Sequence, residues 1–66
     1  MNDYRFGNYI YELRKRAGLS QFELAAAVGV TNKAVSKWEV GKSKPSVESI
    51  RKLAALFQIS AHEFLK

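Results

Sequence analysis

One stretch of the sequence, QFELAAAVGVTNKAVSKW at residues 21–38, constrains the fold most strongly. Its pattern predicts two short helices joined by a tight turn. Ser20 precedes Glu23 by three residues, which is the spacing of a capping box at the start of the first helix. Gly29 can adopt a left-handed conformation without a steric penalty, so we expect the first helix to end there. Thr31 is the expected N-cap of the second helix.

Each of these two helices is expected to have one apolar side, because apolar residues recur in them at helical spacing. The apolar positions are Leu24, Ala25, Val28, Val35 and Trp38. Ala25 supplies the small side chain that two closely crossing helices require. The second helix, expected over about residues 31–40, also has a polar side. The polar residues on that side are Asn32, Lys33, Ser36 and Lys37.

The rest of the chain predicts three more helices around this pair, and hence one all-α domain over residues 1–66 with five helices. The first is expected over residues 4–17, capped by Asn2 or Asp3. Its apolar face is formed by Phe6, Ile10, Leu13 and Ala17, with Tyr9 beside them. Ser46 caps the fourth helix, whose apolar stripe is Val47, Ile50, Leu53, Ala54 and Phe57. The last helix starts with a capping box of Ser60 and Glu63, and Phe64 and Leu65 close the core.

Phe22 stands apart from the apolar face of its helix. Two interpretations are open: the ring folds over the edge of the core, or it forms an exposed patch for a protein partner. We favour packing over the core.

Composition excludes several classes of function. The sequence has no cysteine, and its one histidine, His62, falls in the first turn of the last predicted helix. It has no zinc-binding motif, no paired-carboxylate motif and no glycine-rich phosphate loop, so we expect no enzyme activity, no cofactor and no metal. No apolar run approaches the roughly 18 residues of a membrane span. The N-terminal residues lack a signal-peptide pattern, and we expect a cytoplasmic, nucleoid-associated protein.

The net charge of the chain and the polar residues in segment 21–44 favour double-stranded DNA as the partner. The net charge of +5 suits a polyanion. An α-helix fits the major groove, where Asn can pair with adenine and Lys with guanine. The predicted base-reading residues are Asn32, Lys33, Ser36 and Lys37, although Ser36 could also reach a phosphate. The predicted phosphate-binding residues are Gln21, Thr31, Lys42 and Lys44. RNA is less favoured because no platform of exposed aromatic side chains is predicted.

The sequence resembles the lambda-repressor-like, or Cro/CI-type, helix-turn-helix domains, also called the xenobiotic-response-element family. The segments that carry the resemblance are LRKRAGLSQFELA (13–25), VGVTNKAVSKWEVGKSKPS (28–46) and LAALFQISAHEFL (53–65). The resemblance implies a five-helix domain whose third helix reads the major groove. It also implies a structural ion pair between Arg14 and Glu39, and a homodimer that binds near-palindromic operators as a transcriptional repressor of a bacterium, phage or mobile element.

A second interpretation keeps the same fold but changes the partner. In it the domain is a protein-interaction module, an antitoxin or an accessory factor that contacts another protein through Phe22 or the C-terminal helix. Whether the chain is a stand-alone regulator or a domain excised from a longer one stays open.

Overall fold

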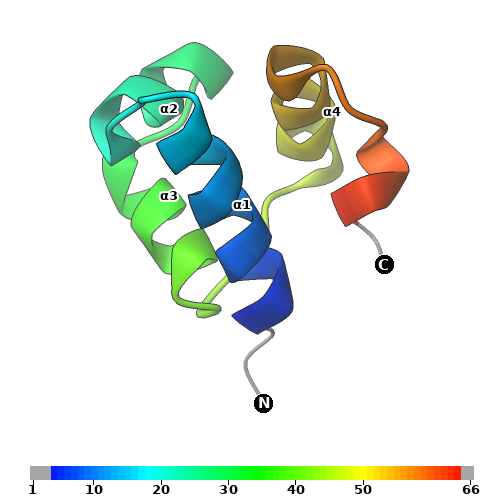
Figure 1. The fold of residues 1–66 in the computed structure, drawn as a ribbon. Helices are drawn as coiled ribbons and strands as arrows, with labels where there is room; N and C mark the ends of the chain where they lie inside the picture. The colour runs from blue at the N-terminus through cyan, green and yellow to red at the C-terminus, as the bar shows by residue number, and fades with distance from the viewer. Residues whose placement is uncertain (1–3, 65–66) are drawn as a thin grey trace.

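The described residues form four α-helices followed by one 3-10 turn (Figure 1). The structure is a computed structural model that describes residues 4–64. The elements are α1 (Tyr4–Arg16), α2 (Gln21–Val28), α3 (Asn32–Glu39), α4 (Val47–Phe57) and η1 (Ala61–Phe64). The all-α prediction is therefore confirmed, with one difference in the last element. There the Glu63 N–H bonds to the Ser60 carbonyl at 3.0 Å, which is the i to i+3 bond of a 3-10 turn.

The predicted caps of α2, α3 and α4 are confirmed, whereas the capping box predicted for Ser60 and Glu63 is not formed as expected. At α2 the Glu23 N–H donates to the Ser20 hydroxyl at 3.0 Å, and the Ser20 N–H donates to the Glu23 carboxylate at 2.8 Å. Thr31 caps α3 by accepting from an N–H in its first turn, and Ser46 does the same at α4. The Ser60 hydroxyl instead accepts from the N–H of His62. The caps expected at Asn2 or Asp3 lie outside the described residues.

All four α-helices end in the same way. A residue in the left-handed conformation follows each helix, and the next N–H bonds back to a carbonyl five residues earlier, as in a Schellman motif. The left-handed residues are Gly18, Gly29, Gly41 and Gln58, with φ of 73°, 75°, 77° and 57°. The residue after three of these positions is a half-buried apolar side chain that packs on the core: Leu19, Val30 or Ile59. After α3 it is Lys42, which is exposed.

The core lies where α1, α2 and α3 meet α4 and η1. Helix α1 packs against α3, α2 packs against both α3 and α4, and η1 packs against α4 (Figure 1). The buried hydrophobic side chains are Ile10, Leu24, Ala25, Val28, Val35, Trp38, Ile50, Leu53, Ala54 and Phe64. The Phe64 ring lies 5.7 Å from the Phe6 ring and 5.3 Å from the Tyr9 ring, centroid to centroid, so η1 closes the core against α1.

Three predicted core positions are wrong, and a fourth cannot be assessed. Phe22 is 71% exposed and Val47 is 68% exposed, because both side chains lie in the first turn of a helix and point away from its packed face. Ala17 follows the last residue of α1 and is also exposed. Leu65 lies outside the described residues.

Gly7 is the site of close approach between α1 and α3. A β-carbon added there would lie 2.5 Å from the carbonyl oxygens of Trp38 and Glu39. Backbone atoms cannot withdraw as the end of a flexible side chain can. Gly7 therefore allows the start of α1 to rest directly on the C-terminal end of α3, and its cost in helix propensity is offset by this packing.

Replacement of Gly7 by alanine is expected to destabilise the protein by about 1–3 kcal/mol through overpacking. Helix propensity alone predicts the opposite sign, a gain of about 1 kcal/mol. Urea unfolding monitored by circular dichroism measures the difference. Asn8→Ala, at the exposed next position in the same helix, is the control and should change stability by less than about 0.5 kcal/mol. A Gly7→Ala variant as stable as the wild type would contradict the close approach.

Replacement of Gln58 by glycine is expected to stabilise the protein by about 0.5–1 kcal/mol. Gln58 is the one left-handed non-glycine residue in the described part of the chain, and that conformation costs an L-residue about 1–2 kcal/mol. The greater freedom of glycine in the unfolded chain cancels part of the gain. Gln58→Ala keeps the strain and should leave the thermal midpoint nearly unchanged. A lower midpoint for Gln58→Gly than for Gln58→Ala would be the contrary result.

Candidate nucleic-acid interface

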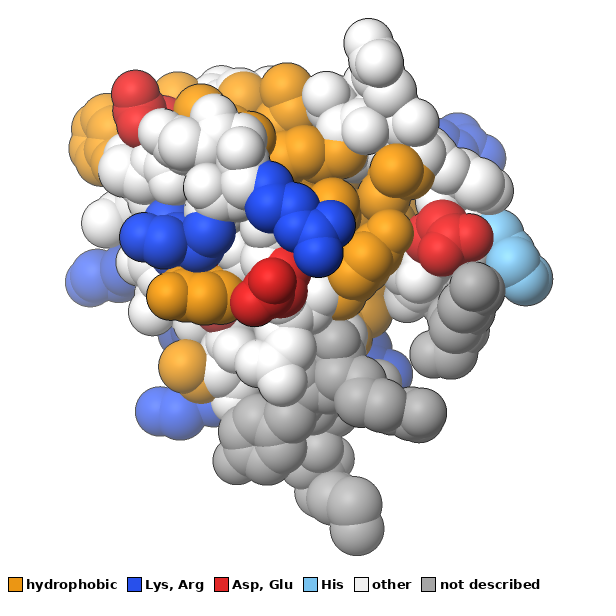
Figure 2. Space-filling view, viewed as in Figure 1, with side chains coloured by type: hydrophobic (Ala, Val, Ile, Leu, Met, Phe, Trp, Pro, Cys, Tyr) orange, Lys and Arg blue, Asp and Glu red, His pale blue; other side chains and the backbone are white. Residues whose placement is uncertain are grey.

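The two sides of α3 differ in the way the sequence predicts. Val35 is fully buried and Trp38 is 4% exposed, so this side fixes the helix to the core. The opposite side is polar, with three exposed residues and one half-buried residue. These are Asn32, Lys33 and Lys37, and half-buried Ser36. Figure 2 shows lysine and arginine side chains along the left edge of the view, the side on which Figure 1 places α3.

Two loop lysines follow the helix end at Gly41. The N–H of Lys42 donates to the carbonyl of Lys37 at 2.9 Å, so the loop folds against the last turn of α3. Lys42 and Lys44 are both exposed. A cation beside the carbonyl end of a helix is favourable, and Lys42 follows Gly41 at that end of α3.

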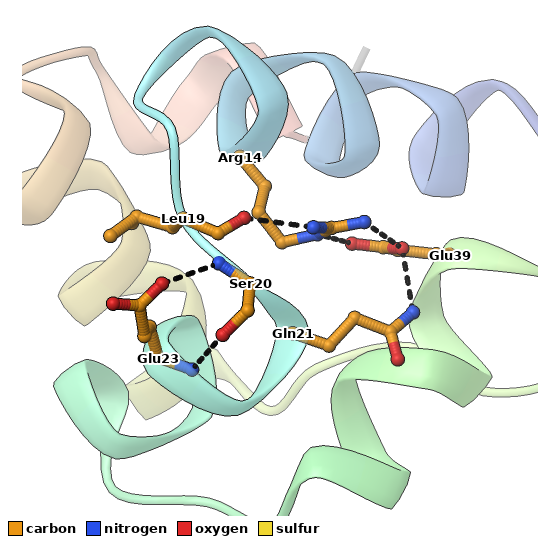
Figure 3. Close-up of polar contacts among 6 residues, drawn as sticks. All are labelled: Arg14, Leu19, Ser20, Gln21, Glu23 and Glu39. Atoms are coloured by element: carbon orange, nitrogen blue, oxygen red, sulfur yellow. Dashed lines mark hydrogen bonds and ion pairs between the residues drawn. The ribbon is translucent and has the colours of Figure 1, made fainter.

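Gln21, the first residue of α2, lies beside the end of α3. Its Nε2 donates to Oε1 of Glu39 at 2.9 Å, and its side chain is half-buried (Figure 3). The first N–H groups of a helix have no partners within the helix. The start of α2 therefore offers hydrogen-bond donors both from the backbone and from the Gln21 amide. A phosphate oxygen can accept hydrogen bonds from both.

Arg14 holds this region together through three hydrogen bonds (Figure 3). Its Nε donates to Oε2 of Glu39 at 2.7 Å, and its Nη2 donates to Oε1 at 3.2 Å. Its Nη1 donates to the Leu19 carbonyl at 2.8 Å. The two charged side chains are only 9% and 6% exposed. The hydrogen bond to Glu39 raises the pKa of Arg14 above its ordinary value, and burial opposes this only in part.

The ion pair implied by the family resemblance is thus present, but its extension to Gln21 was not predicted. The two partners, Gln21 and Glu39, are 18 residues apart and lie on different helices. No spacing rule within a helix connects them. The signal in the sequence was only that Glu39 is an acidic residue within a basic segment.

Thr31 and Phe22 flank the start of α3. Thr31 is exposed, and its hydroxyl oxygen accepts from the Ala34 N–H at 3.2 Å. The Phe22 ring borders a shallow apolar hollow whose lining residues are Ala25, Ala26, Val30, Thr31 and Asn32. The structure therefore places an exposed aromatic ring next to the predicted base-reading end of α3.

Residues 4–64 contain neither a candidate metal site nor a candidate membrane-spanning helix. This part of the chain has no group of three or more histidine, cysteine or acidic side chains arranged to hold a metal ion. None of its helices combines the length and apolar character needed to cross a membrane.

Comparison with known proteins places the chain in the helix-turn-helix family. The family model described as helix-turn-helix matches residues 10–64. The HTH-type transcriptional activator BcrR of Enterococcus faecalis is 35% identical over 60 residues, covering 91% of this chain and 29% of BcrR. Repressor protein C2 of Salmonella phage P22 is 35% identical over 66 residues, covering 100% of this chain and 31% of that repressor.

A solved structure of the P22 c2 repressor in complex with a synthetic operator superposes with a TM-score of 0.87. The two sequences are 34% identical in this comparison, which covers 92% of each chain. The chain spans about a third or less of the length of BcrR and of repressor protein C2. The similarity to them therefore concerns only part of each relative.

Removal of the Arg14 charge is expected to be strongly destabilising. Arg14→Met should cost about 3–5 kcal/mol because it leaves the Glu39 carboxylate buried without its cation. Adding Glu39→Leu to that variant should recover part of the loss, since a well-packed apolar pair can replace a buried ion pair. Urea unfolding of both single variants and the double variant measures the coupling. Arg16→Met, at an exposed arginine of the same helix, is the control. Additive losses would contradict the buried pair.

Proposed function

Because the chain belongs to the helix-turn-helix family, among its lambda-repressor-like Cro/CI-type domains, we propose that it is a sequence-specific DNA-binding transcriptional regulator, specifically a repressor. The observation that carries the proposal is the division of α3 into a buried side and a side of exposed amide and ammonium groups. A helix of this kind can be fixed to a core while its other side enters the major groove. The P22 c2 repressor, which has a similar fold, has been solved in complex with a synthetic operator.

In this proposal the polar side of α3 reads bases. Asn32 and Lys33 lie at its N-terminal end, which approaches base edges in helix-turn-helix complexes. Lys37 lies one turn beyond Lys33 on the same side. The Asn32 amide can pair with adenine, and the lysines can pair with the guanine O6 and N7 atoms. Ser36 lies between these residues and donates to a base or a phosphate.

The phosphates on either side of the groove are bound by donors outside the polar side of α3. Gln21 supplies an amide at the start of α2, and Thr31 supplies a hydroxyl at the start of α3. Lys42 and Lys44 supply charge at the other end of α3. Such contacts fix the register of the protein on DNA and depend strongly on salt.

One domain of this size covers a small footprint, so we propose that two copies bind one operator. Their recognition helices would then lie about 34 Å apart, on successive turns of the same face of the duplex. The proposal places the protein in the cytoplasm, associated with the nucleoid. It assigns no catalytic step to the chain.

The exposed Phe22 ring supports a second candidate function, which is recognition of another protein. A single exposed aromatic ring is weaker support than the arrangement of α3, because isolated apolar side chains are common on protein surfaces. The two candidates differ in their response to DNA.

Selection from a random duplex pool, followed by titration across a salt series, tests the proposed function. The expected result is a consensus with two related half-sites and an affinity that falls steeply as salt rises. No duplex binding at low salt, together with a stable complex with another protein, would overturn the proposal in favour of the second candidate.

Two lysine substitutions should weaken DNA binding in different ways. Lys33→Ala should cost about 1–3 kcal/mol on the consensus and relax the preference at one base position. Lys42→Ala should weaken all duplexes alike and lower the salt slope by about 0.9. Arg51→Ala, at an exposed position on α4, is the charge-matched control and should have little effect. Equal losses on every sequence for Lys33→Ala would rule out its base-reading role.

A further inference from the structure

The bond between Gln21 and Glu39 fixes the orientation of an amide that the proposed function places against DNA. An ionised carboxylate only accepts hydrogen bonds, so it must face the NH₂ end of the amide and not its oxygen. The 2.9 Å bond from Nε2 to Oε1 therefore directs the Gln21 oxygen away from Glu39 (Figure 3). One Nε2 hydrogen is used in this bond, and the second is left for another acceptor.

Glu39 is itself held in place. Arg14 bonds to both of its carboxylate oxygens, and it also bonds to the Leu19 carbonyl just before α2 begins. The same guanidinium thus fixes the carboxylate at the end of α3 and the backbone that leads into Gln21. Its positive charge also reduces the repulsion that a carboxylate in this position would exert on a phosphate.

We propose that Glu39 is a positioning residue that orients the Gln21 amide so that its second N–H binds one phosphate of the operator. The inference rests on the proposed function and adds a specific role for Glu39 within it. Glu39 does not touch DNA in this proposal. The bond from Glu39 disfavours the flipped orientation of the Gln21 amide. It also restricts the Gln21 rotamers before binding, so less conformational entropy is lost on binding and affinity rises by preorganisation.

The test uses the tightest duplex from a random-pool selection, prepared with single neutral methylphosphonates at successive positions. Wild-type protein should lose affinity at several positions, one of which is the Gln21 contact. At that position the loss should be on the order of tenfold, as for a hydrogen bond to a charged group. Gln21→Met should abolish the sensitivity at that position only.

Glu39→Gln and Glu39→Asp should reduce the sensitivity at the same position, and the losses at all other phosphates should remain. A merely structural role for Glu39 would lower stability or weaken every phosphate contact alike. It would not remove the methylphosphonate sensitivity at one position only. Glu39→Asp keeps the charge for Arg14 but withdraws the carboxylate from Gln21. Glu48→Asp, at an exposed glutamate on α4, is the matched control and should keep the wild-type pattern.

Should both Glu39 variants fail to fold, the wild-type protein still decides the question. The two side-chain amide protons of Gln21 can be followed by NMR as the duplex is added. The proton not bonded to Glu39 should shift, while the bonded proton should keep its shift and its slow exchange with solvent. Loss of the bonded signal on addition of duplex would overturn the positioning role.

The remaining outcomes separate this inference from the proposed function. Absence of any duplex binding by wild-type protein would overturn the proposed function and this inference with it. Duplex binding in which Gln21→Met erases no position, or in which the Glu39 variants keep the Gln21 position, would overturn the inference alone.

Discussion

The buried ion pair between Arg14 and Glu39 is the interaction on which the arrangement of the helices depends. It joins the last turn of α1 to the last turn of α3, and the same guanidinium holds the Leu19 carbonyl before α2. Burial of two charges is costly unless each is fully hydrogen-bonded, and here the carboxylate also accepts from Gln21. In the described part of the chain no buried side-chain polar atom lacks a hydrogen-bond partner. The pair therefore fixes the geometry of three helices at one point.

Short C-terminal motifs at the helix ends also help to fix the arrangement of the helices. The same C-terminal motif ends each of the four α-helices, and after three of them it places an apolar side chain on the core. At α3 that position holds exposed Lys42, so the end of the candidate recognition helix presents charge where the other helices pack. At the other end of α1, Gly7 lets two backbones meet directly. The residue after the left-handed position thus distinguishes α3, which we propose reads DNA, from the other three α-helices.

Much of this structure could be predicted because its determinants are local. A cap such as Ser20 acts over three residues, and helical periodicity is enough to separate the two sides of α3. Prediction failed for Phe22 and Val47, because the first turn of a helix can carry an apolar residue outside the packed face. Helix propensity gives no reason for a glycine at Gly7, because glycine is unfavourable inside a helix. The contact that explains this glycine is made by a distant helix, as is the bond from Gln21 to Glu39.

The central claim is that α3 lies in the major groove, and chemical interference tests it most directly. A selected duplex is methylated with dimethyl sulfate, which modifies guanine N7 in the major groove and adenine N3 in the minor groove. Bound and free fractions are then compared base by base. The account predicts that methylation at guanine N7 prevents binding at positions in each half-site, while adenine N3 methylation there is tolerated. Interference confined to adenine N3, or tight binding unaffected by either modification, would contradict it.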